Sequence, residues 1–275
     1  MELVARLTAE LEHCGSILVG YSGGVDSALV AVAARQALGR ESVVAGLGIS
    51  PSVSAEQRDQ ARAMAARFDI TLVEVETTEF ADPDYIANRT DRCYFCKREL
   101  WSHLVAAATR LGMAVVADGT NADDSTDHRP GHRAGHEYSV RSPLAELGFA
   151  KADVRTAARL LGIPIWDAPA APCLSSRVLY GLEVTPARVG QVEAGEAILR
   201  RFGVQGDMRL RHRGDEARIE VTPSQQGTVR HHRDAIGGEI LDLGFARVTL
   251  DALGYRRGSF LDEATPTVEL LAERA

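Results

Sequence analysis

The chain has 275 residues, 45% hydrophobic and 25% charged, with a net charge of −7. These ordinary globular values exclude disordered, collagen-like and disulfide-stapled proteins. The negative balance argues against non-specific nucleic-acid or membrane binding, and no apolar run approaches the roughly 18 residues of a membrane span. Because the first residues lack the basic-then-apolar order of a signal peptide, we expect a cytoplasmic protein with four reduced or metal-bound cysteines.

The first part of the chain alternates strand and helix patterns. Apolar runs of strand length lie at 16–21, 43–49, 70–75 and 113–117. Helical patterns lie at 3–13, 28–38, 54–68, 96–111 and 151–161, whereas 123–148 has a loop-like composition. In the third helix Ser54 is a candidate cap, with Gln57 at the position that completes a capping box. Such alternation predicts an α/β domain over 1–178, with a parallel sheet and helices on both faces.

The composition changes after a Pro-rich loop at 164–181, so we place a domain boundary near 178. Beyond it the predicted helices are 185–202 and 224–243, and the predicted strands are 209–211, 217–221 and 246–250. This order indicates a small α+β domain over 179–275. The charged tail at 263–275 has a helical composition.

The strongest motif is SGGVDS, which begins at Ser22 between the first predicted strand and the second helix. Gly23 and Gly24 allow the backbone to approach an anion, and the amides at the start of the following helix point at it. Ser22 and Ser27 add hydroxyl donors, and Asp26 can hold Mg²⁺ that bridges phosphate oxygens. A glycine turn with a serine cap is the simpler alternative, and a Walker A pattern is absent.

A second polar segment, DGTNADD at 118–124, follows the fourth predicted strand. Because parallel sheets bind ligands at the carboxyl ends of their strands, this segment and SGGVDS should open on one cleft. We therefore predict that Asn121 and Asp123 border the nucleotide or the substrate.

The cysteines form a third pattern, in which Cys93 and Cys96 make a CxxC pair and Cys173 lies in the Pro-rich loop. The pair is compatible with a redox site, half of a zinc site, an iron–sulfur site or simple packing of a helix start. Three thiolates suit a [4Fe-4S] cluster with one open iron. Only Lys97 and Lys151 among 31 basic residues are lysines, which makes both candidates for sites that need a compact ammonium group.

The combined motifs resemble a known group of enzymes. SGGxDS resembles the signature of the PP-loop ATP pyrophosphatases, which include NAD synthetase, GMP synthetase and tRNA-thiolating enzymes. The chain adds RCYFCK, DGTNADD, RPG, SPL and PCLSSR, at 92–97, 118–124, 129–131, 142–144 and 172–177. With these blocks nearly the whole chain resembles the LarE family of PP-loop sulfur transferases.

The resemblance implies a substrate and a reaction. The family adenylates a carboxylate of pyridinium-3,5-biscarboxylic acid mononucleotide with ATP and Mg²⁺, and a sulfur nucleophile then displaces AMP. The thiocarboxylate product serves the nickel-pincer nucleotide cofactor of lactate racemase. The resemblance also implies a homo-oligomer and catalytic roles for Asp26, Lys97 and Cys173.

Two branches of the family differ in the source of sulfur. In one, the cysteine that matches Cys173 donates its own sulfur and is left as dehydroalanine. In the other, three cysteines bind a [4Fe-4S] cluster that carries a removable sulfide. The pattern of Cys93, Cys96 and Cys173 favours the cluster branch.

A polyanionic substrate on an acidic protein requires a local basic patch. Alternation along a strand puts Arg209 and Arg211 on one face. With Arg177, and with Ser176 beside it, they are candidates for the substrate phosphate and carboxylates. We also consider Glu196 and Glu220 as ligands of a second divalent ion. A solvated strand face is the alternative for the arginines, and surface charge is the alternative for the two glutamates.

Two other functions stay open at this point. The first is an amidating or tRNA-thiolating PP-loop enzyme, although no glutaminase segment is present and a tRNA binder is usually more basic. The second is a non-enzymatic iron–sulfur or nucleotide sensor on the same fold. Assays of pyrophosphate release distinguish an adenylating enzyme from a sensor.

Overall fold

A computed structural model describes residues 1–125, 130–169, 172–256 and 266–271. The chain divides into two compact units. The first comprises Met1–Tyr85 and Thr90–Ala171, and the second comprises Ile86–Arg89 and Pro172–Ala275. The division at 171/172 lies seven residues before the predicted boundary at 178. Among the described residues, no helix is long and apolar enough to cross a membrane.

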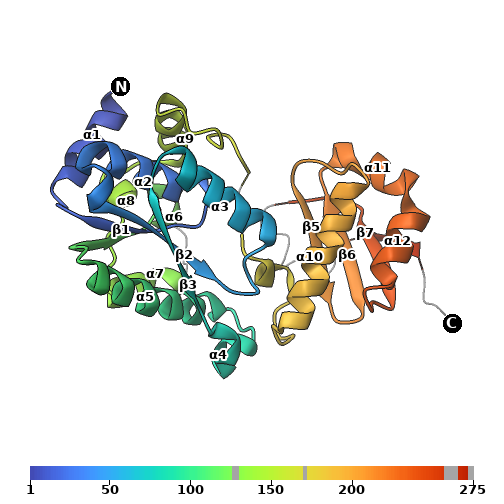
Figure 1. Ribbon diagram of the computed structural model, residues 1–275. Coiled ribbons are helices and arrows are strands. Elements are labelled where there is room, and N and C mark those ends of the chain that lie inside the picture. The colour runs from blue at the N-terminus through green and yellow to red at the C-terminus, as the bar shows by residue number, and fades with distance from the viewer. Residues whose placement is uncertain (126–129, 170–171, 257–265, 272–275) are drawn as a thin grey trace. The chain divides into compact units, whose positions relative to one another are not determined.

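The first unit is built on a parallel four-stranded sheet in the order β3-β2-β1-β4 (Figure 1). Its strands are β1 Ile17–Gly20, β2 Val43–Ile49, β3 Thr71–Glu76 and β4 Val115–Ala117. Side chains alternate along β1, so that Ile17 and Val19 join one apolar cluster and Leu18 joins another. The two clusters lie on opposite faces of the sheet, which confirms the predicted α/β class.

Helices cover both faces of this sheet (Figure 1). On one side lie α1 Glu2–Glu12, α2 Val25–Leu38, α3 Ala55–Arg67 and α9 Lys151–Leu160. On the other side lie α5 Arg92–Leu111 and α7 Pro130–Glu137. The short helices are α4 Pro83–Ile86, α6 Ala122–Ser125 and α8 Pro143–Glu146, with 3-10 turns η1 Arg40–Ser42 and η2 Glu79–Ala81. Gly20 lets α5 approach closely, because a β-carbon there would lie 2.6 Å from the Trp101 ring.

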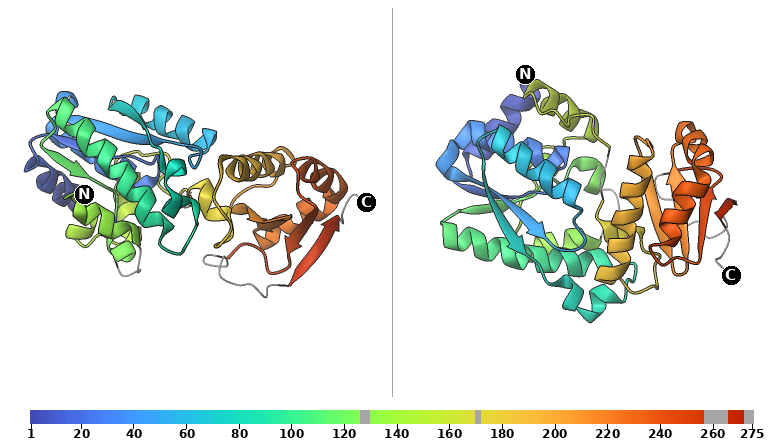
Figure 2. Two further views of the ribbon diagram at one scale, coloured as in Figure 1. Left: turned by 90° about the horizontal axis from the view of Figure 1, so that it is seen from below. Right: turned by 45° about the vertical axis from the view of Figure 1, so that its right-hand side comes forward.

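The second unit holds a mixed sheet in the order β5-β6-β7-β8. Its strands are β5 Met208–Arg213, β6 Glu216–Val221, β7 Arg247–Asp251 and β8 Thr267–Leu271. β6 and β7 run parallel, and the two outer pairs are antiparallel. The helices α10 Pro186–Arg201, α11 Gln226–His231 and α12 Arg233–Leu241 lie on one face (Figure 2), and the 3-10 turns are η3 Leu174–Arg177 and η4 Pro223–Gln225. This is the predicted α+β arrangement.

Several predicted boundaries were wrong. α5 begins at Arg92 and not at 96, so the CxxC pair lies inside the helix. The loop-like stretch 123–148 contains α7 and α8, which are too short to show a clear helical period. The predicted helix 224–243 breaks at His232, whose backbone is not helical.

The predicted helix in the tail was also wrong where the structure describes it. Thr267–Leu271 is a strand that pairs antiparallel with β7. The charged composition of the tail favoured a helix, but pairing with a neighbouring strand overrides such a local preference. The rest of the predicted tail helix, 263–265 and 272–275, lies outside the described residues.

Candidate functional site

The SGGVDS loop (residues 22–27) connects β1 to α2. Gly23 has a φ of +74°, and a β-carbon there would lie 3.0 Å from Cβ of Ala61 in α3. Gly24 is the extended residue before α2, and it provides no side-chain cap. The first amides of a helix have no partner within the helix. The start of α2 is therefore a suitable place for an anion.

The two serines brace the loop internally. The Ser27 hydroxyl donates to the Gly24 carbonyl at 3.1 Å and accepts from the Ser22 amide at 3.2 Å. The Ser22 hydroxyl accepts from the Gly24 amide at 3.4 Å. The serines thus fix the turn, and their predicted contact with a nucleotide stays a prediction.

Two glutamines of α3 hold the loop from outside. The side-chain amide of Gln57 donates to the Ser22 carbonyl at 3.1 Å, and that of Gln60 donates to the Gly23 carbonyl at 2.9 Å. Because a trans peptide is planar, a carbonyl drawn toward α3 turns the amide of the same peptide to the opposite side. Ser54 caps α3 as predicted, but Gln57 contacts the loop and does not complete the capping box.

Asp26 lies in the first turn of α2, where its carboxylate has two partners. The Lys151 ammonium nitrogen lies 2.5 Å from Oδ2, and the Asn121 amide donates to Oδ1 at 3.1 Å. Among residues with described positions, no group of three or more His, Cys, Asp or Glu side chains is arranged to hold a metal ion. Mg²⁺ in nucleotide sites is usually held by one or two carboxylates, phosphates and water. A single carboxylate beside an anion site fits that pattern.

The DGTN segment packs directly against this loop. A β-carbon at Gly119 would lie 2.5 Å from the amide nitrogen of Ser27, so only glycine allows this approach. Asn121 contacts Asp26, and the Asp123 carboxylate accepts from the backbone amide of Lys151 at 2.9 Å. The structure therefore brings the two predicted segments together at one edge of the sheet.

The CxxC pair occupies the first turns of α5. Cys93 is exposed and Cys96 is partly exposed, and neither forms a disulfide. Residues three apart lie on the same side of a helix, as two ligands of one metal centre would. The Lys97 ammonium nitrogen lies 5.1 Å from the centroid of the Trp101 ring, within the range of a cation–π contact. Arg129 of the RPG motif lies outside the described residues.

Cys173 belongs to the second unit, immediately before η3. It is partly exposed and not in a disulfide. Its backbone carbonyl accepts from the Ser176 hydroxyl at 2.7 Å and from the Arg177 guanidinium at 2.9 Å. Three thiols that are not in disulfides suit an iron–sulfur cluster chemically, but they are divided between the two units, so the cluster remains a prediction.

Five buried charged residues and the partly buried Ser176, all of them predicted, form one group in the second unit, which we call the arginine cluster. Its members are Ser176, Arg177, Glu196, Arg209, Arg211 and Glu220. Arg177 pairs with Glu196 at 3.0 Å, and Arg211 pairs with Glu220 at 2.9 Å. Arg211 also donates to the Ser176 carbonyl at 3.1 Å. Residues from η3, α10, β5 and β6 thus meet.

The arginine cluster is not a solvated face. Arg209 and Arg211 are 7% and 8% exposed, and Glu196 and Glu220 are 2% and 3% exposed. Burial, and then repulsion from Arg177, lowers the pKa of Arg209. A buried carboxylate needs a cationic partner, and both glutamates have an arginine in that role. The predicted second divalent ion therefore gains no support from the structure and stays a prediction.

Sequence reasoning missed some of the supporting residues. Gln57 was considered only for the capping box and Gln60 carries no motif; their contact with the loop depends on how α3 packs against it. Lys151 had a signal, because it is one of two lysines in an arginine-rich chain. That ammonium group forms an ion pair with Asp26.

Comparison with known proteins gives two kinds of match. Residues 1–94 match the NAD synthase family. The chain is 45% identical over 262 residues to an uncharacterized protein of Synechocystis sp., covering 94% of this chain and 95% of that protein. It is 36% identical over 262 residues to pyridinium-3,5-bisthiocarboxylic acid mononucleotide synthase of Lactiplantibacillus plantarum, which covers 95% of this chain and 94% of that protein. It is 31% identical to the NH(3)-dependent NAD(+) synthetase of Chlorobaculum tepidum over 156 residues, or 54% of each chain.

Proposed function

Because this chain belongs to the LarE family of PP-loop sulfur transferases, we propose that it makes a thiocarboxylate from pyridinium-3,5-biscarboxylic acid mononucleotide, using ATP. The observation that carries the proposal is the loop itself: an uncapped helix start, with Asp26 in its first turn. Similarity over nearly the whole chain to a synthase of a bisthiocarboxylic mononucleotide supports the choice of substrate. The product would serve a nickel-pincer nucleotide cofactor.

The first step is adenylation. A carboxylate oxygen of the substrate attacks the α-phosphorus of ATP, and the bond to pyrophosphate breaks. The amides of Gly23, Gly24 and the start of α2 would hold the pyrophosphate end, and the hydroxyls of Ser22 and Ser27 would exchange their contacts within the loop for contacts with it. Such preformed donors stabilise the charge that develops on the phosphate oxygens. Mg²⁺ would be held by Asp26 and would neutralise part of that charge, with Asn121 and Asp123 lining the same site.

The second step transfers sulfur to the acyl carbon. A sulfur nucleophile attacks that carbon, the bond to AMP breaks, and the thiocarboxylate leaves. Cys93, Cys96 and Cys173 would hold a [4Fe-4S] cluster that supplies a removable sulfide from its open iron. Lys97, adjacent to Cys96, places positive charge beside the incoming sulfur.

The arginine cluster suits the polyanionic substrate. Arg177, Arg209 and Arg211 carry three positive charges, against two on Glu196 and Glu220. The ion pairs fix the guanidinium planes in position before a ligand arrives, which favours directional contacts with phosphate or carboxylate. Ser176 lies beside them through its carbonyl contact with Arg211.

The source of sulfur is tested by anaerobic purification and reconstitution. We expect one [4Fe-4S] cluster per chain, and its loss in Cys93→Ala, Cys96→Ala and Cys173→Ala. In the sacrificial alternative the Cys173 thiolate forms a thioester, its Cβ–S bond breaks as Cα loses a proton, and the protein loses the elements of H₂S. That mass loss at Cys173, with no iron bound and with active Cys93→Ala and Cys96→Ala variants, would establish the sacrificial branch.

Further expectations concern the oligomeric state, the cellular location and the reaction product. We expect a homo-oligomer in the cytoplasm, without nucleic acid or membrane as a partner. Light scattering of the purified protein measures the oligomeric state. The match to the NAD synthase family covers residues 1–94, which include the SGGVDS loop, and it supports shared adenylation. An amide product formed with ammonia would favour the amidating alternative.

A further inference from the structure

The ion pair between Lys151 and Asp26 raises a question about the nucleotide site. Asp26 is the carboxylate that would hold Mg²⁺, yet its Oδ2 lies 2.5 Å from the Lys151 ammonium nitrogen. We propose that Lys151 is an exchangeable counter-ion: it pairs with Asp26 as long as no nucleotide is bound and passes to the phosphates when Mg²⁺ arrives with ATP. This inference deepens the proposed function and rests on its ATP-binding part alone.

The base of Lys151 is fixed while its tip is accessible. Its backbone amide donates to Asp123 at 2.9 Å, and the preceding amide of Ala150 donates to Asp153 at 3.0 Å. One turn further along α9, Val154 is fully buried. The Lys151 side chain nevertheless remains 34% exposed. A flexible four-carbon stem on a fixed backbone allows the ammonium to move without moving the helix.

The choice of lysine supports this role. The chain uses arginine at 29 of its 31 basic positions, but lysine here. An arginine pairs with both oxygens of a carboxylate through two parallel bonds. Lys151 instead takes one oxygen of Asp26 and leaves the other to Asn121. A point charge held through one oxygen is easier to displace than a two-point pair.

Exchange keeps the charges balanced in both states. In the ion pair the ammonium offsets the carboxylate, which is only 24% exposed. When Mg²⁺ takes the carboxylate, the ammonium is released beside the start of α2, where phosphate oxygens would lie. Neither state leaves a half-buried charge without a partner, which would be costly.

The test is a double-mutant cycle on ATP affinity, measured by calorimetry on the full chain with EDTA or with Mg²⁺. In EDTA we expect Asp26→Asn to bind ATP about tenfold more tightly than wild type, because Lys151 is then free for the phosphates. We expect no such gain when Asp26→Asn is added to the Lys151→Met variant. With Mg²⁺, Asp26→Asn should bind ATP more weakly than wild type.

Arg159→Met is the matched control, because it removes one positive charge from an exposed site on the same helix. In that background the gain from Asp26→Asn should persist. Lys151→Gln serves as the second variant if the methionine variant does not fold. An equal gain in the Lys151 and Arg159 backgrounds overturns the exchange and leaves the proposed function intact. Wild-type protein that binds no ATP under either condition overturns the nucleotide part of the proposed function, and this inference with it.

Discussion

The SGGVDS loop and the arginine cluster differ in how they would present charge to a ligand. The loop uses backbone amides at a helix start, and its main members are neighbours in sequence. The arginine cluster uses long side chains from η3, α10, β5 and β6, and each charge is buried. The loop therefore depends on local conformation and close approach, whereas the cluster depends on every ionic partner being present.

This difference predicts two kinds of sensitivity. In the loop the donors are backbone amides, so most side chains can be replaced without removing them. The exceptions are a metal ligand and the glycines, where an added β-carbon would meet neighbouring atoms. In the cluster, loss of one ionic partner leaves the other charge buried and unpaired, which lowers the stability of the folded state. The following predictions test that contrast.

The largest effect is expected at the loop. Asp26→Ala should lower ATP-dependent pyrophosphate release about a thousandfold, because no other acidic side chain of the loop can hold Mg²⁺. The fold should stay intact, since Asp26 lies on a partly exposed first turn. Asp69→Ala, which removes a carboxylate from an exposed surface pair, is the control and should release pyrophosphate normally. Normal release by Asp26→Ala at saturating Mg²⁺ and ATP would remove the basis for the site.

In the arginine cluster the expected effect is on stability. Glu196→Ala leaves the buried Arg177 without its carboxylate, and should lower the free energy of unfolding by about 3–5 kcal/mol. The surface pair of Arg201 with Glu239 offers a control, because Glu239→Ala should cost only about 0–1 kcal/mol. Chemical denaturation of the full chain compares them. Equal losses would show that burial does not distinguish the cluster from the surface.

Substrate binding gives a third, smaller difference. Arg209→Ala or Arg211→Ala should weaken binding of the dicarboxylate mononucleotide by about 1.5–3 kcal/mol, while changing ATP affinity less. Calorimetry with each ligand measures the two effects, with Arg201→Ala as a control for general loss of positive charge. Unchanged affinity for the mononucleotide in both variants would refute the assignment.

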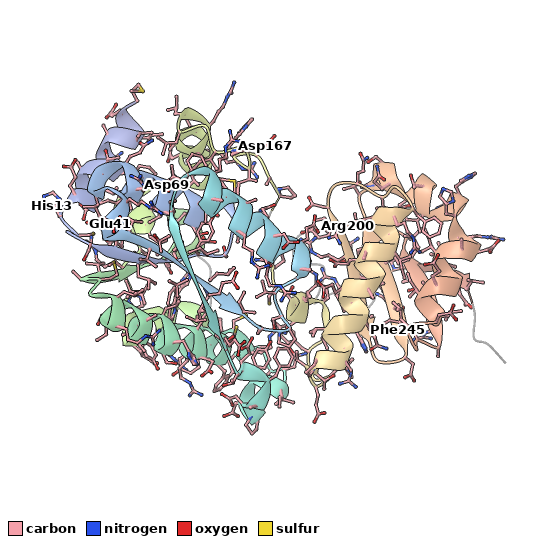
Figure 3. All side chains as sticks on the ribbon, viewed as in Figure 1. His13, Glu41, Asp69, Asp167, Arg200 and Phe245 are labelled. Carbon is pink, nitrogen blue, oxygen red and sulfur yellow. The ribbon has the colours of Figure 1, made fainter. Side chains whose placement is uncertain are left out.

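The smallest expected effect is a pH dependence in the second unit. His212 is buried with its ring against that of Phe245, and burial lowers its pKa from 6.5 to about 4. Figure 3 labels Phe245 in the second unit. Arg188 lowers the pKa of His212 further, while Asp215 opposes the shift. Because the fold favours the neutral ring, this stabilisation is complete above pH 6.5 and is lost as the pH falls toward 4.

The comparison for this pH effect is His212→Gln. Its unfolding midpoint should change less between pH 6.5 and pH 4 than that of the wild type. His212 donates from Nε2 to the side-chain oxygen Oε1 of Gln191 at 3.0 Å, and glutamine keeps a neutral donor at this position. Parallel pH profiles for the two proteins would assign the acid sensitivity to other groups.

The contrast between the two sites also explains what the sequence predicts. The loop could be predicted because its glycines, serines and carboxylate are contiguous and follow a buried strand. Asp26 contacts Asn121 and Lys151, which lie 95 and 125 residues away. Strand order placed β4 beside β1 and made the Asn121 contact possible, and general sheet rules predicted that convergence. No sequence rule predicted which atoms would pair.

The arginine cluster could be predicted only in part. Alternation correctly put Arg209 and Arg211 on one face of a strand, but it does not tell whether that face is solvated. Burial follows from the packing of η3 and α10, so the alternative of a solvated basic face was wrong. The tail strand was missed for the same reason, because pairing with β7 is a tertiary contact.

The central claim is that ATP-driven adenylation leads to sulfur transfer onto the pyridinium mononucleotide. The most direct measurement is mass spectrometry of an anaerobic reaction containing the reconstituted protein, ATP, Mg²⁺ and the dicarboxylate mononucleotide. The account predicts a product in which sulfur replaces one carboxylate oxygen, with one AMP and one pyrophosphate formed for each sulfur transferred. Adenylation with release of pyrophosphate but without any sulfur-containing product, or formation of an amide, would contradict it.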